Sequence, residues 1–225
     1  MESREQAVRE GNVTTGDAAR PAPGETVVLI HGLGGTGMLM VPLARRIGQA
    51  GYGTLNWSYR SYLHTIQRHA DQLRHRLGEL DADPQVSCIH LVTHSMGTIV
   101  ARCALVEGRP DKLGRWVMLA PPNRGSPLAA FWGPKLRWCV PVIDQLAKRA
   151  DSFVNRLPQP EQIDVGVIAA SRDWMVGSGN SCLPCQSDYI VLSGTHTLLL
   201  FLRRSADETI EFLSTGRFST HACRG

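Results

Sequence analysis

The sequence predicts an α/β protein with a mainly parallel sheet of about six strands and helices on both faces. Short apolar runs alternate along the chain with longer segments whose apolar residues recur every three or four positions. The short runs are rich in β-branched residues, which is typical of parallel strands that are buried on both faces. The length of 225 residues, with 43% hydrophobic and 20% charged residues, is that of one ordinary globular domain.

The expected elements follow from these patterns in chain order. The apolar runs predict strands at 26–30, 52–57, 86–92, 116–120, 165–170 and 189–192. The helical periodicity predicts helices at 41–49, 63–80, 96–106 and 198–213. Pro42 falls in the first turn of the first predicted helix, where its missing N–H is tolerated.

The domain is expected to span residues 26–218. Residues 1–25 are polar and aperiodic and predict a flexible leader, and residues 219–225 form a tail. The segment 124–164 is a long insertion between two strands, and it is too apolar for an exposed loop. Two interpretations remain open for it, an ordinary crossover helix packed on the sheet or a cap that walls an apolar cleft. Trp132 and Trp138 favour an apolar substrate in the second interpretation.

The charge and the cysteines exclude several classes of protein. The net charge of +4 is spread along the chain, which does not indicate nucleic-acid binding. The apolar run 198–202 is far shorter than the roughly 20 residues that cross a bilayer. The first 20 residues have no apolar signal region and the chain has only six cysteines, so we expect a cytoplasmic location. Cys182 and Cys185 form one C-x-x-C pair without the second pair of a zinc ribbon, so no metal site is predicted.

The strongest functional motif is the run Leu-Val-Thr-His-Ser-Met-Gly at 91–97, where a predicted strand gives way to a helix. It follows the G-x-S-x-G pattern of a nucleophile elbow around Ser95, with Thr93 in place of the first glycine. Gly97 allows strand and helix to pass closely, whereas Thr93 adds bulk. The alternative for Ser95 is an ordinary helix N-cap.

A glycine-rich loop follows the first predicted strand. His31 and Gly32 are followed by Leu33 and two further glycines, so a backbone amide there can meet the amide that follows Ser95. The amides of Leu33 and Met96 are therefore the predicted oxyanion-hole donors. A phosphate-binding loop is the alternative, but neither of its glycine signatures is present.

His196 is the predicted general base, because it follows the last strand and precedes the last helix. His31 and His94 flank the site and are expected to shape it. The remaining helical histidines are interpreted as solvated surface: His64, His69 and His75.

In this order of motifs, and in the run 119–126 (Leu-Ala-Pro-Pro-Asn-Arg-Gly-Ser), the chain resembles the α/β-hydrolase family, in its small serine lipase/esterase-like branch. The resemblance covers roughly residues 26–218. It implies the α/β-hydrolase fold and a serine carboxyl-ester hydrolase that forms an acyl-enzyme with an apolar acyl substrate. The substrate would be a small-molecule ester or a lipid-like ester. The resemblance implies no cofactor, and no protein partner is predicted.

The family also places a triad carboxylate between the last two strands, often as an Asp-Gly pair. Here the corresponding stretch reads Gly-Asn-Ser-Cys at 179–182. Asp188 begins the last strand, roughly 16 Å from the catalytic edge at about 3.3 Å per residue, so Asp173 is the preferred acid. Because Thr93 and the acid loop depart from the pattern, a catalytically weakened binding protein remains an alternative. A thioesterase with the same triad is another.

Overall fold

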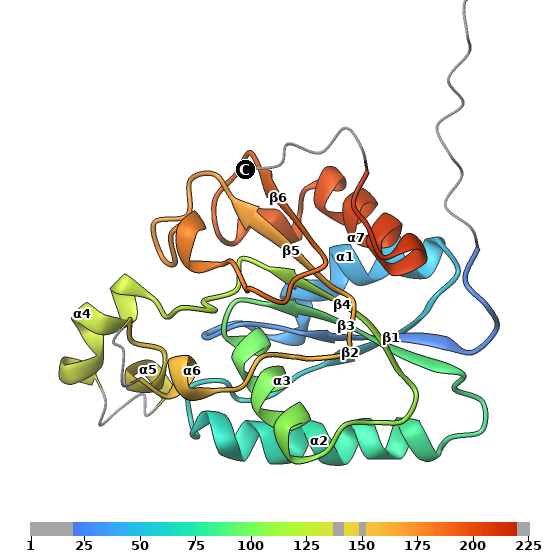
Figure 1. Ribbon diagram of the computed structural model, residues 1–225, viewed down its shortest axis with the longest axis horizontal. Helices are drawn as coiled ribbons and strands as arrows, with labels where there is room; N and C mark the ends of the chain where they lie inside the picture. The colour runs from blue at the N-terminus through green and yellow to red at the C-terminus, as the bar shows by residue number, and fades with distance from the viewer. Residues whose placement is uncertain (1–19, 137–141, 149–151, 220–225) are drawn as a thin grey trace, which may run out of the picture.

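The computed structural model describes residues 20–136, 142–148 and 152–219, which form one layered α/β domain (Figure 1). Its sheet has six parallel strands in the order β2-β1-β3-β4-β5-β6, so the predicted fold class is confirmed. The strands are β1 (Glu25–Ile30), β2 (Gly53–Trp57), β3 (Cys88–His94), β4 (Leu113–Leu119), β5 (Val165–Ala170) and β6 (Asp188–Leu192).

Helices cover both faces of the sheet. α1 (Gly37–Gln49) and α7 (Arg203–Thr215) lie on one face, and α2 (Ile66–Ala82) and α3 (Met96–Glu107) lie on the other (Figure 1). Successive residues of β1 alternate between the two cores, Val27 packing with the α1–α7 layer and Val28 with the α2–α3 layer. Because both faces are buried, the strands are continuous apolar runs, which is why the sequence predicts them well.

From β1 the chain adds β2 on one side of the sheet, and it then crosses to the other side, where β3 to β6 follow in order. The helix after β1 (α1) and the helix after β3 (α3) accordingly lie on opposite faces, so the direction of winding changes between β1 and β3 (Figure 1). In open parallel sheets, ligands bind at such a switch point, beyond the carboxyl ends of the strands. The loops at this point carry Leu33 after β1 and Ser95 after β3.

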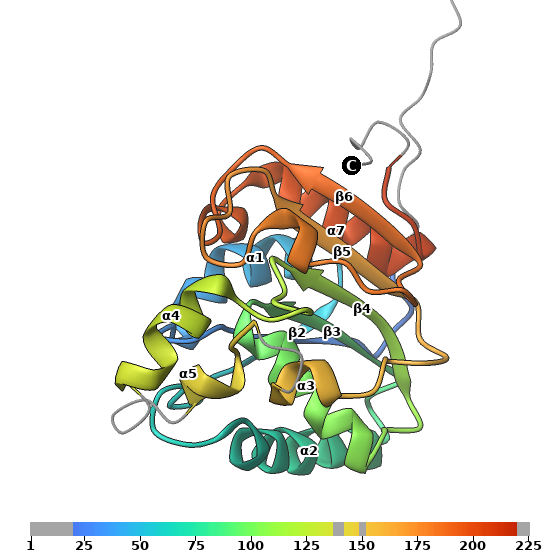
Figure 2. The same cartoon turned by 60° about the vertical axis from the view of Figure 1, so that its left-hand side comes forward.

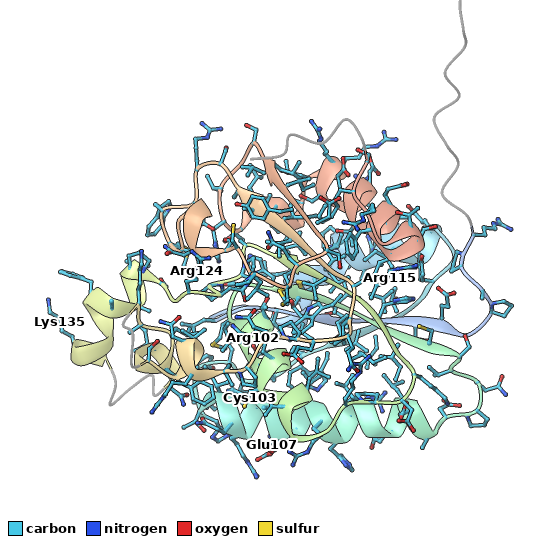
Figure 3. All side chains as sticks on the ribbon, in the orientation of Figure 1. Arg102, Cys103, Glu107, Arg115, Arg124 and Lys135 are labelled. Carbon is cyan, nitrogen blue, oxygen red and sulfur yellow. The ribbon has the colours of Figure 1, made fainter. Side chains whose placement is uncertain are left out.

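The insertion 124–164 forms three short helices rather than one crossover helix. They are α4 (Pro127–Leu136), α5 (Val142–Gln145) and α6 (Phe153–Arg156), and α4 and α5 lie beyond the carboxyl ends of the central strands (Figure 2). The buried Arg102 of α3 donates to the carbonyl oxygens of Leu157 at 2.9 Å and Pro158 at 3.3 Å (Figure 3). This arginine therefore ties the end of the insertion to the domain. Trp138 lies outside the described residues, and of Trp132 only the backbone is described.

Two predicted helices have different bounds in the structure. α1 begins at Gly37 and holds Pro42 in its interior, rather than starting at 41. The predicted helix 198–213 is instead a 3-10 turn η2 (Leu198–Leu200) followed by α7, because Leu202 adopts an extended conformation (φ −69°, ψ 131°). Leu199 and Leu200 are buried in the turn, which keeps the apolar pattern although the helix is interrupted.

The predicted leader extended to residue 25, but its described end, residues 20–24, packs on the domain. Ser87 donates its hydroxyl to the carbonyl of Pro23 at 2.8 Å and its amide to that of Gly24 at 3.0 Å. Glu25 already belongs to β1. Residues 1–19 and 220–225, the rest of the predicted leader and most of the tail, lie outside the described residues.

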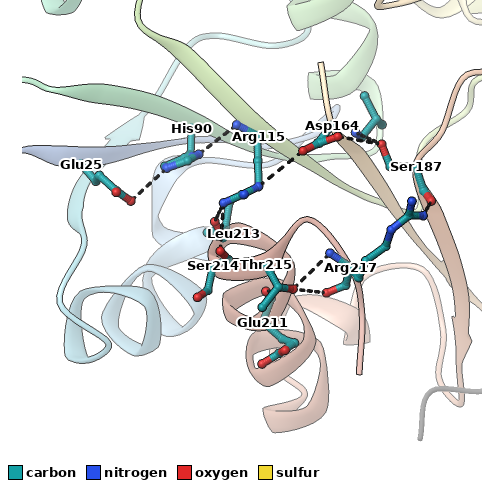
Figure 4. Close-up of polar contacts among 11 residues, drawn as sticks. Glu25, His90, Arg115, Asp164, Ser187, Glu211, Leu213, Ser214, Thr215 and Arg217 are labelled. Atoms are coloured by element: carbon teal, nitrogen blue, oxygen red, sulfur yellow. Dashed lines mark hydrogen bonds and ion pairs between the residues drawn. The ribbon is translucent and has the colours of Figure 1, made fainter. Parts of the chain in front are cut away.

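The amino ends of the strands carry a polar network on the opposite side from the switch point (Figure 4). His90 contacts Glu25 at 3.2 Å and accepts the amide of Arg115 at 2.9 Å, and Arg115 reaches Asp164 at 3.6 Å. Arg115 also donates to the carbonyls of Leu213 and Ser214 at the end of α7. This network joins strands β1, β3 and β4 to α7 away from the candidate site.

Candidate active site

Ser95 lies at a sharp turn between β3 and α3. Its backbone has φ 52° and ψ −127°, a conformation that residues other than glycine rarely adopt. The Ser95 amide donates to the carbonyl of Leu119 at 2.9 Å, and its carbonyl accepts the amide of Thr98 at 3.0 Å. The side chain is only partly buried, so the hydroxyl can be reached from the cavity described below.

The turn requires glycine at two positions. A Cβ at Gly97 would lie 2.5 Å from the carbonyl oxygen of His31, so strand β1 passes directly against the start of α3. A Cβ at Gly32 would lie 2.8 Å from the Cβ of Ser95. Both distances are shorter than real Cβ contacts, so no larger residue fits without movement of the backbone.

Thr93 fits the elbow although glycine is usual at its position. The side chain is fully buried, and its hydroxyl contacts that of Thr98 at 2.8 Å and accepts the indole N–H of Trp116 at 2.9 Å. The added bulk is therefore packed and hydrogen-bonded. It does not separate strand from helix.

The structure brings His196 and Asp173 together from the loops after β6 and β5. His196 Nδ1 lies 2.7 Å from Asp173 Oδ2, and the two side chains are only 5% and 1% exposed. Asp173 Oδ1 accepts the amides of Met175 and Val176, both at 3.0 Å. Asp188, the other carboxylate considered, accepts the amides of Tyr189 and Phe218 instead.

Asp173 is held ionised by its partners. Burial alone would raise the pKa of Asp173, but the hydrogen bond and the charge of His196, together with the amides of Val176 and Met175, lower the pKa below its ordinary value. An ionised Asp173 accepts the proton on His196 Nδ1. When the ring carries a single proton, this bond keeps the proton on Nδ1, so Nε2 is the acceptor.

His94 supports His196 from the side. The His94 Nε2 donates to the backbone carbonyl of His196 at 3.2 Å, and the two rings lie 4.9 Å apart. Burial, and then the charge of His196, lower the pKa of His94 to about 3, so its ring stays neutral. His94 thus lies beside His196, and its role in shaping the site stays a prediction.

A cavity of about 330 Å³ opens at the carboxyl edge of the sheet. Ser95, His196 and Leu33 all line it. The rest of its lining is mostly apolar and comes from the β4–α4 segment, α5 and the acid loop: Pro122, Ser126, Leu128, Ala129, Ile143, Leu146, Met175 and Val176. No hydrogen bond joins Ser95 to His196 among the described contacts, and such bonds are often long until substrate binds.

The two predicted oxyanion donors flank Ser95. Leu33 follows β1 and Met96 is the first residue of α3, with its side chain fully buried. Within the described ranges, neither backbone amide donates a hydrogen bond to another protein group. Leu33 lines the cavity, and Met96 directly follows Ser95, which also lines it.

The expectation that His69 lies on the solvated surface is wrong, because its side chain is buried and packs edge-on against the ring of Tyr59, with centroids 4.7 Å apart. Among the described residues, no group of His, Cys, Asp and Glu side chains is arranged to hold a metal ion, and no helix there is long and apolar enough to span a membrane. Cys182 and Cys185 are free thiols.

Sequence reasoning missed two supports of this site. Ser126 donates its hydroxyl to the carbonyl of Met175 at 2.6 Å and so links α4 to the acid loop. Tyr59 and Ser61, in the loop after β2, hold the glycine-rich loop after β1. Ser126 falls in the run 119–126, but nothing in that run indicates its bond to the acid loop, and no motif or periodicity marks Tyr59 and Ser61, because these contacts join loops that are distant in the sequence.

The three-dimensional comparison identifies the fold. The chain matches the mature Bacillus licheniformis lipase BlEst2 with a TM-score of 0.68 and 16% identity, over 82% of this chain and 90% of that one. It matches a Pyrococcus furiosus esterase (TM-score 0.64, 19% identity, 85% and 83% covered) and a Paleococcus ferrophilus monoacylglycerol lipase (TM-score 0.62, 17% identity, 85% and 94% covered). No family model matches the sequence, and no curated protein sequence matches it. At sequence identities of 16–19%, these matches show that the chain shares the fold of these proteins.

Proposed function

The chain has the α/β-hydrolase fold, and we propose that it is a serine carboxyl-ester hydrolase acting through an acyl-enzyme. One observation carries this proposal. Ser95 and His196 line a single apolar cavity, and His196 is hydrogen-bonded on its other side to the buried carboxylate of Asp173. These three side chains come from three separate loops at one edge of the sheet, where open α/β sheets bind ligands.

The residues have complementary roles in the proposed reaction. Ser95 Oγ attacks the acyl carbon while His196 Nε2 takes the hydroxyl proton. The amides of Leu33 and Met96 donate to the tetrahedral oxyanion, and the positive end of α3 favours the same charge. His196 then gives its proton to the leaving alcohol oxygen, and the C–O bond of the ester breaks. Asp173 stays ionised throughout and stabilises the imidazolium.

Water completes the cycle. A water molecule attacks the Ser95 acyl carbon and passes a proton to His196 Nε2, and the same amides hold the second oxyanion. His196 returns the proton to Ser95 Oγ as the carboxylic acid leaves. Every proton transfer uses Nε2 of His196. The reaction therefore depends on Asp173, which keeps the other ring proton on Nδ1.

The cavity supports an apolar acyl group. Its lining beyond Ser95 and His196 is mostly apolar, and α4 and α5 contribute Leu128, Ala129 and Ile143. A charged acyl chain would lose its hydration against these walls without gaining a partner. We propose that the insertion 124–164 acts as a cap over this pocket.

The test is direct. Purified full-length protein is assayed with p-nitrophenyl acetate, butyrate, octanoate and laurate, next to Ser95→Ala and the matched control Ser205→Ala. Ser205 is a fully buried serine on α7 whose hydroxyl has no partner among the described residues. We expect Ser95→Ala to lose hydrolysis and Ser205→Ala to keep it, whereas hydrolysis by Ser95→Ala at the wild-type rate excludes the proposal.

A fluorophosphonate probe separates the enzyme from a weakened binding protein. The enzyme is labelled covalently at Ser95, whereas a folded binding protein with an inactive serine is not labelled. The buried, hydrogen-bonded Thr93 and the Asp173–His196 pair favour the enzyme. Matched acyl thioesters in the same assay distinguish a thioesterase.

We also propose a cytoplasmic location. Four cysteines lie in the described part of the chain, Cys88, Cys103, Cys182 and Cys185, and all are free. Free thiols are typical of a reducing compartment.

A further inference from the structure

The Leu33 N–H lies in the peptide plane that joins Gly32 to Leu33, and the next plane, which joins Leu33 to Gly34, restrains the residue from its other side. A peptide unit is planar, so its carbonyl and its N–H point in opposite directions and turn together. Anything that holds the Gly32 carbonyl therefore also aims the Leu33 N–H. The turn that contains both lies against Ser95, because a Cβ at Gly32 would come within 2.8 Å of the Ser95 Cβ.

The first plane is held through the Gly32 carbonyl oxygen. It accepts the Nδ1–H of His31 at 2.9 Å and the amide of Gly35 at 3.2 Å. The His31 bond requires the tautomer that carries its proton on Nδ1. Burial lowers the pKa of His31, so the ring is neutral and the tautomer is decided by its hydrogen bonds.

Tyr59 decides that tautomer. Its backbone amide donates to His31 Nε2 at 3.3 Å, so Nε2 is the acceptor and the proton stays on Nδ1. The Tyr59 hydroxyl donates to the backbone carbonyl of His31 at 2.9 Å. The two rings are stacked, with centroids 4.4 Å apart and planes 19° from parallel. One residue of the β2–α2 loop thus contacts His31 on its ring face, its Nε2 and its carbonyl.

The second plane is held by Ser61. Gly34 has φ +70° and donates its amide to Ser61 Oγ at 3.0 Å. Ser61 is fully buried, and its own amide donates to the carbonyl of Tyr59 at 3.0 Å. The contacts from Tyr59 and Ser61 therefore come from one compact turn and fix the peptides on both sides of Leu33.

We infer that Tyr59 and Ser61 are positioning residues that hold the Leu33 amide in the direction of the oxyanion, an inference that rests on the ester hydrolysis proposed above. Neither side chain lines the cavity, so neither contacts the substrate there. Their effect reaches the reaction only through His31, Gly34 and the planes of the intervening peptides. Preorganised donors of this kind lower the barrier because they need no rearrangement when charge develops.

The experiment compares Tyr59→Phe and Ser61→Ala with two matched controls. Tyr62→Phe removes the hydroxyl of an exposed tyrosine in the same loop, and Ser205→Ala removes a buried serine hydroxyl of α7 that does not line the cavity. Fluorophosphonate titration counts the active sites, so kcat is expressed per reactive Ser95. Each variant is also assayed with an alkyl trifluoromethyl ketone, which adds Ser95 Oγ and forms an oxyanion, and with the matching methyl ketone.

We expect kcat to fall about tenfold in Ser61→Ala and about threefold in Tyr59→Phe with KM unchanged, less than the 10²–10³ typical of deleting a donor. The inhibition constant of the trifluoromethyl ketone rises by the same factor, and that of the methyl ketone does not change. A merely structural role would lower the melting temperature and the number of active sites without changing this ratio of ketone affinities.

The outcomes distinguish a failure of the positioning role of Tyr59 and Ser61 from a failure of the proposed ester hydrolysis. An active wild type whose Tyr59→Phe and Ser61→Ala variants match the controls in kcat and in both ketone affinities overturns this inference alone. A wild type that neither hydrolyses esters nor reacts with the fluorophosphonate overturns the proposed function, and this inference with it.

Discussion

His196 Nδ1 lies 2.7 Å from Asp173 Oδ2, and both side chains are almost completely buried. Asp173 comes from the loop after β5 and His196 from the loop after β6, two neighbouring parallel strands. The carboxyl ends of neighbouring parallel strands meet at one edge of the sheet, so residues far apart in sequence become hydrogen-bonded partners there.

The first prediction concerns this pair. Asp173→Asn should lower kcat about 10³- to 10⁴-fold, because an amide can donate to His196 Nδ1 and favour the wrong tautomer. KM should change little, since Asp173 does not line the cavity. Steady-state kinetics with a p-nitrophenyl ester measure both constants.

Asp188→Asn is the matched control, because Asp188 is the other carboxylate of the same region and contacts the amides of Tyr189 and Phe218. It should retain the wild-type kcat. A large loss of kcat in Asp188→Asn, with none in Asp173→Asn, would show that the acid has been assigned to the wrong residue.

The second prediction concerns the close passage of β1 against α3. Gly97→Ala should lower the free energy of unfolding by about 1–3 kcal/mol, because the new Cβ overlaps the carbonyl oxygen of His31. Urea denaturation measures this change. Gly78→Ala is the control: Gly78 is exposed on α2 with open space around it, and alanine there should stabilise by about 0.5–1 kcal/mol. Equal effects of the two substitutions would contradict the packing described here.

The third prediction concerns acid stability. The pKa of His94 is lowered from 6.5 to about 3 by burial and by the charge of His196. Below pH 6.5 the unfolded chain binds a proton at His94 that the folded chain does not, so the free energy of unfolding falls as the pH falls. The contribution of His94 is present in full above its ordinary pKa and is lost progressively toward its folded pKa.

His94→Gln removes this titration and leaves the other groups. Between pH 6 and 4 the wild type should therefore lose about 1.4 kcal/mol more per pH unit than the variant. Denaturant unfolding at several pH values gives the two slopes. Parallel curves for the two proteins would mean that His94 does not titrate as its burial requires.

The fourth prediction concerns substrate length. Ala129 is a buried residue of α4 that lines the cavity, so Ala129→Leu fills space proposed for the acyl chain. The value of kcat/KM for p-nitrophenyl octanoate should fall about 10- to 100-fold, and that for the acetate should not change. Ala130→Leu, at the next position and outside the cavity lining, should leave both values near wild type. Equal losses for both esters would place the acyl chain elsewhere.

Much of the site could be predicted because its signals are local. Ser95 is marked by the change from an apolar strand to a helix and by Gly97, whose missing side chain the structure requires. Leu33 and His196 are marked by their places directly after buried strands. The choice of Asp173 over Asp188 used only strand geometry, and the structure places Asp173 beside His196.

Other features carry no local signal. His69 shares a helix with exposed residues, and its burial against the rings of Tyr59 and His64 depends on how the β2–α2 loop folds over the helix. The apolar pattern of 198–213 continues through a break at Leu202, because a 3-10 turn and a helix can bury the same face. The three helices of the insertion follow no clear periodicity, and Arg102 anchors one end of them through backbone carbonyls.

The sequence by itself determined the layered α/β architecture, the positions of the strands and the elbow at Ser95, because burial and backbone conformation impose short-range patterns on residue types. The tertiary structure alone decided where the insertion lies and how Tyr59 and Ser61 hold the loop that carries Leu33. Those contacts are made between loops, whose sequences lack the hydrophobic periodicity that predicts strands and helices. They exist only once the sheet has brought the carboxyl ends of its strands to one edge.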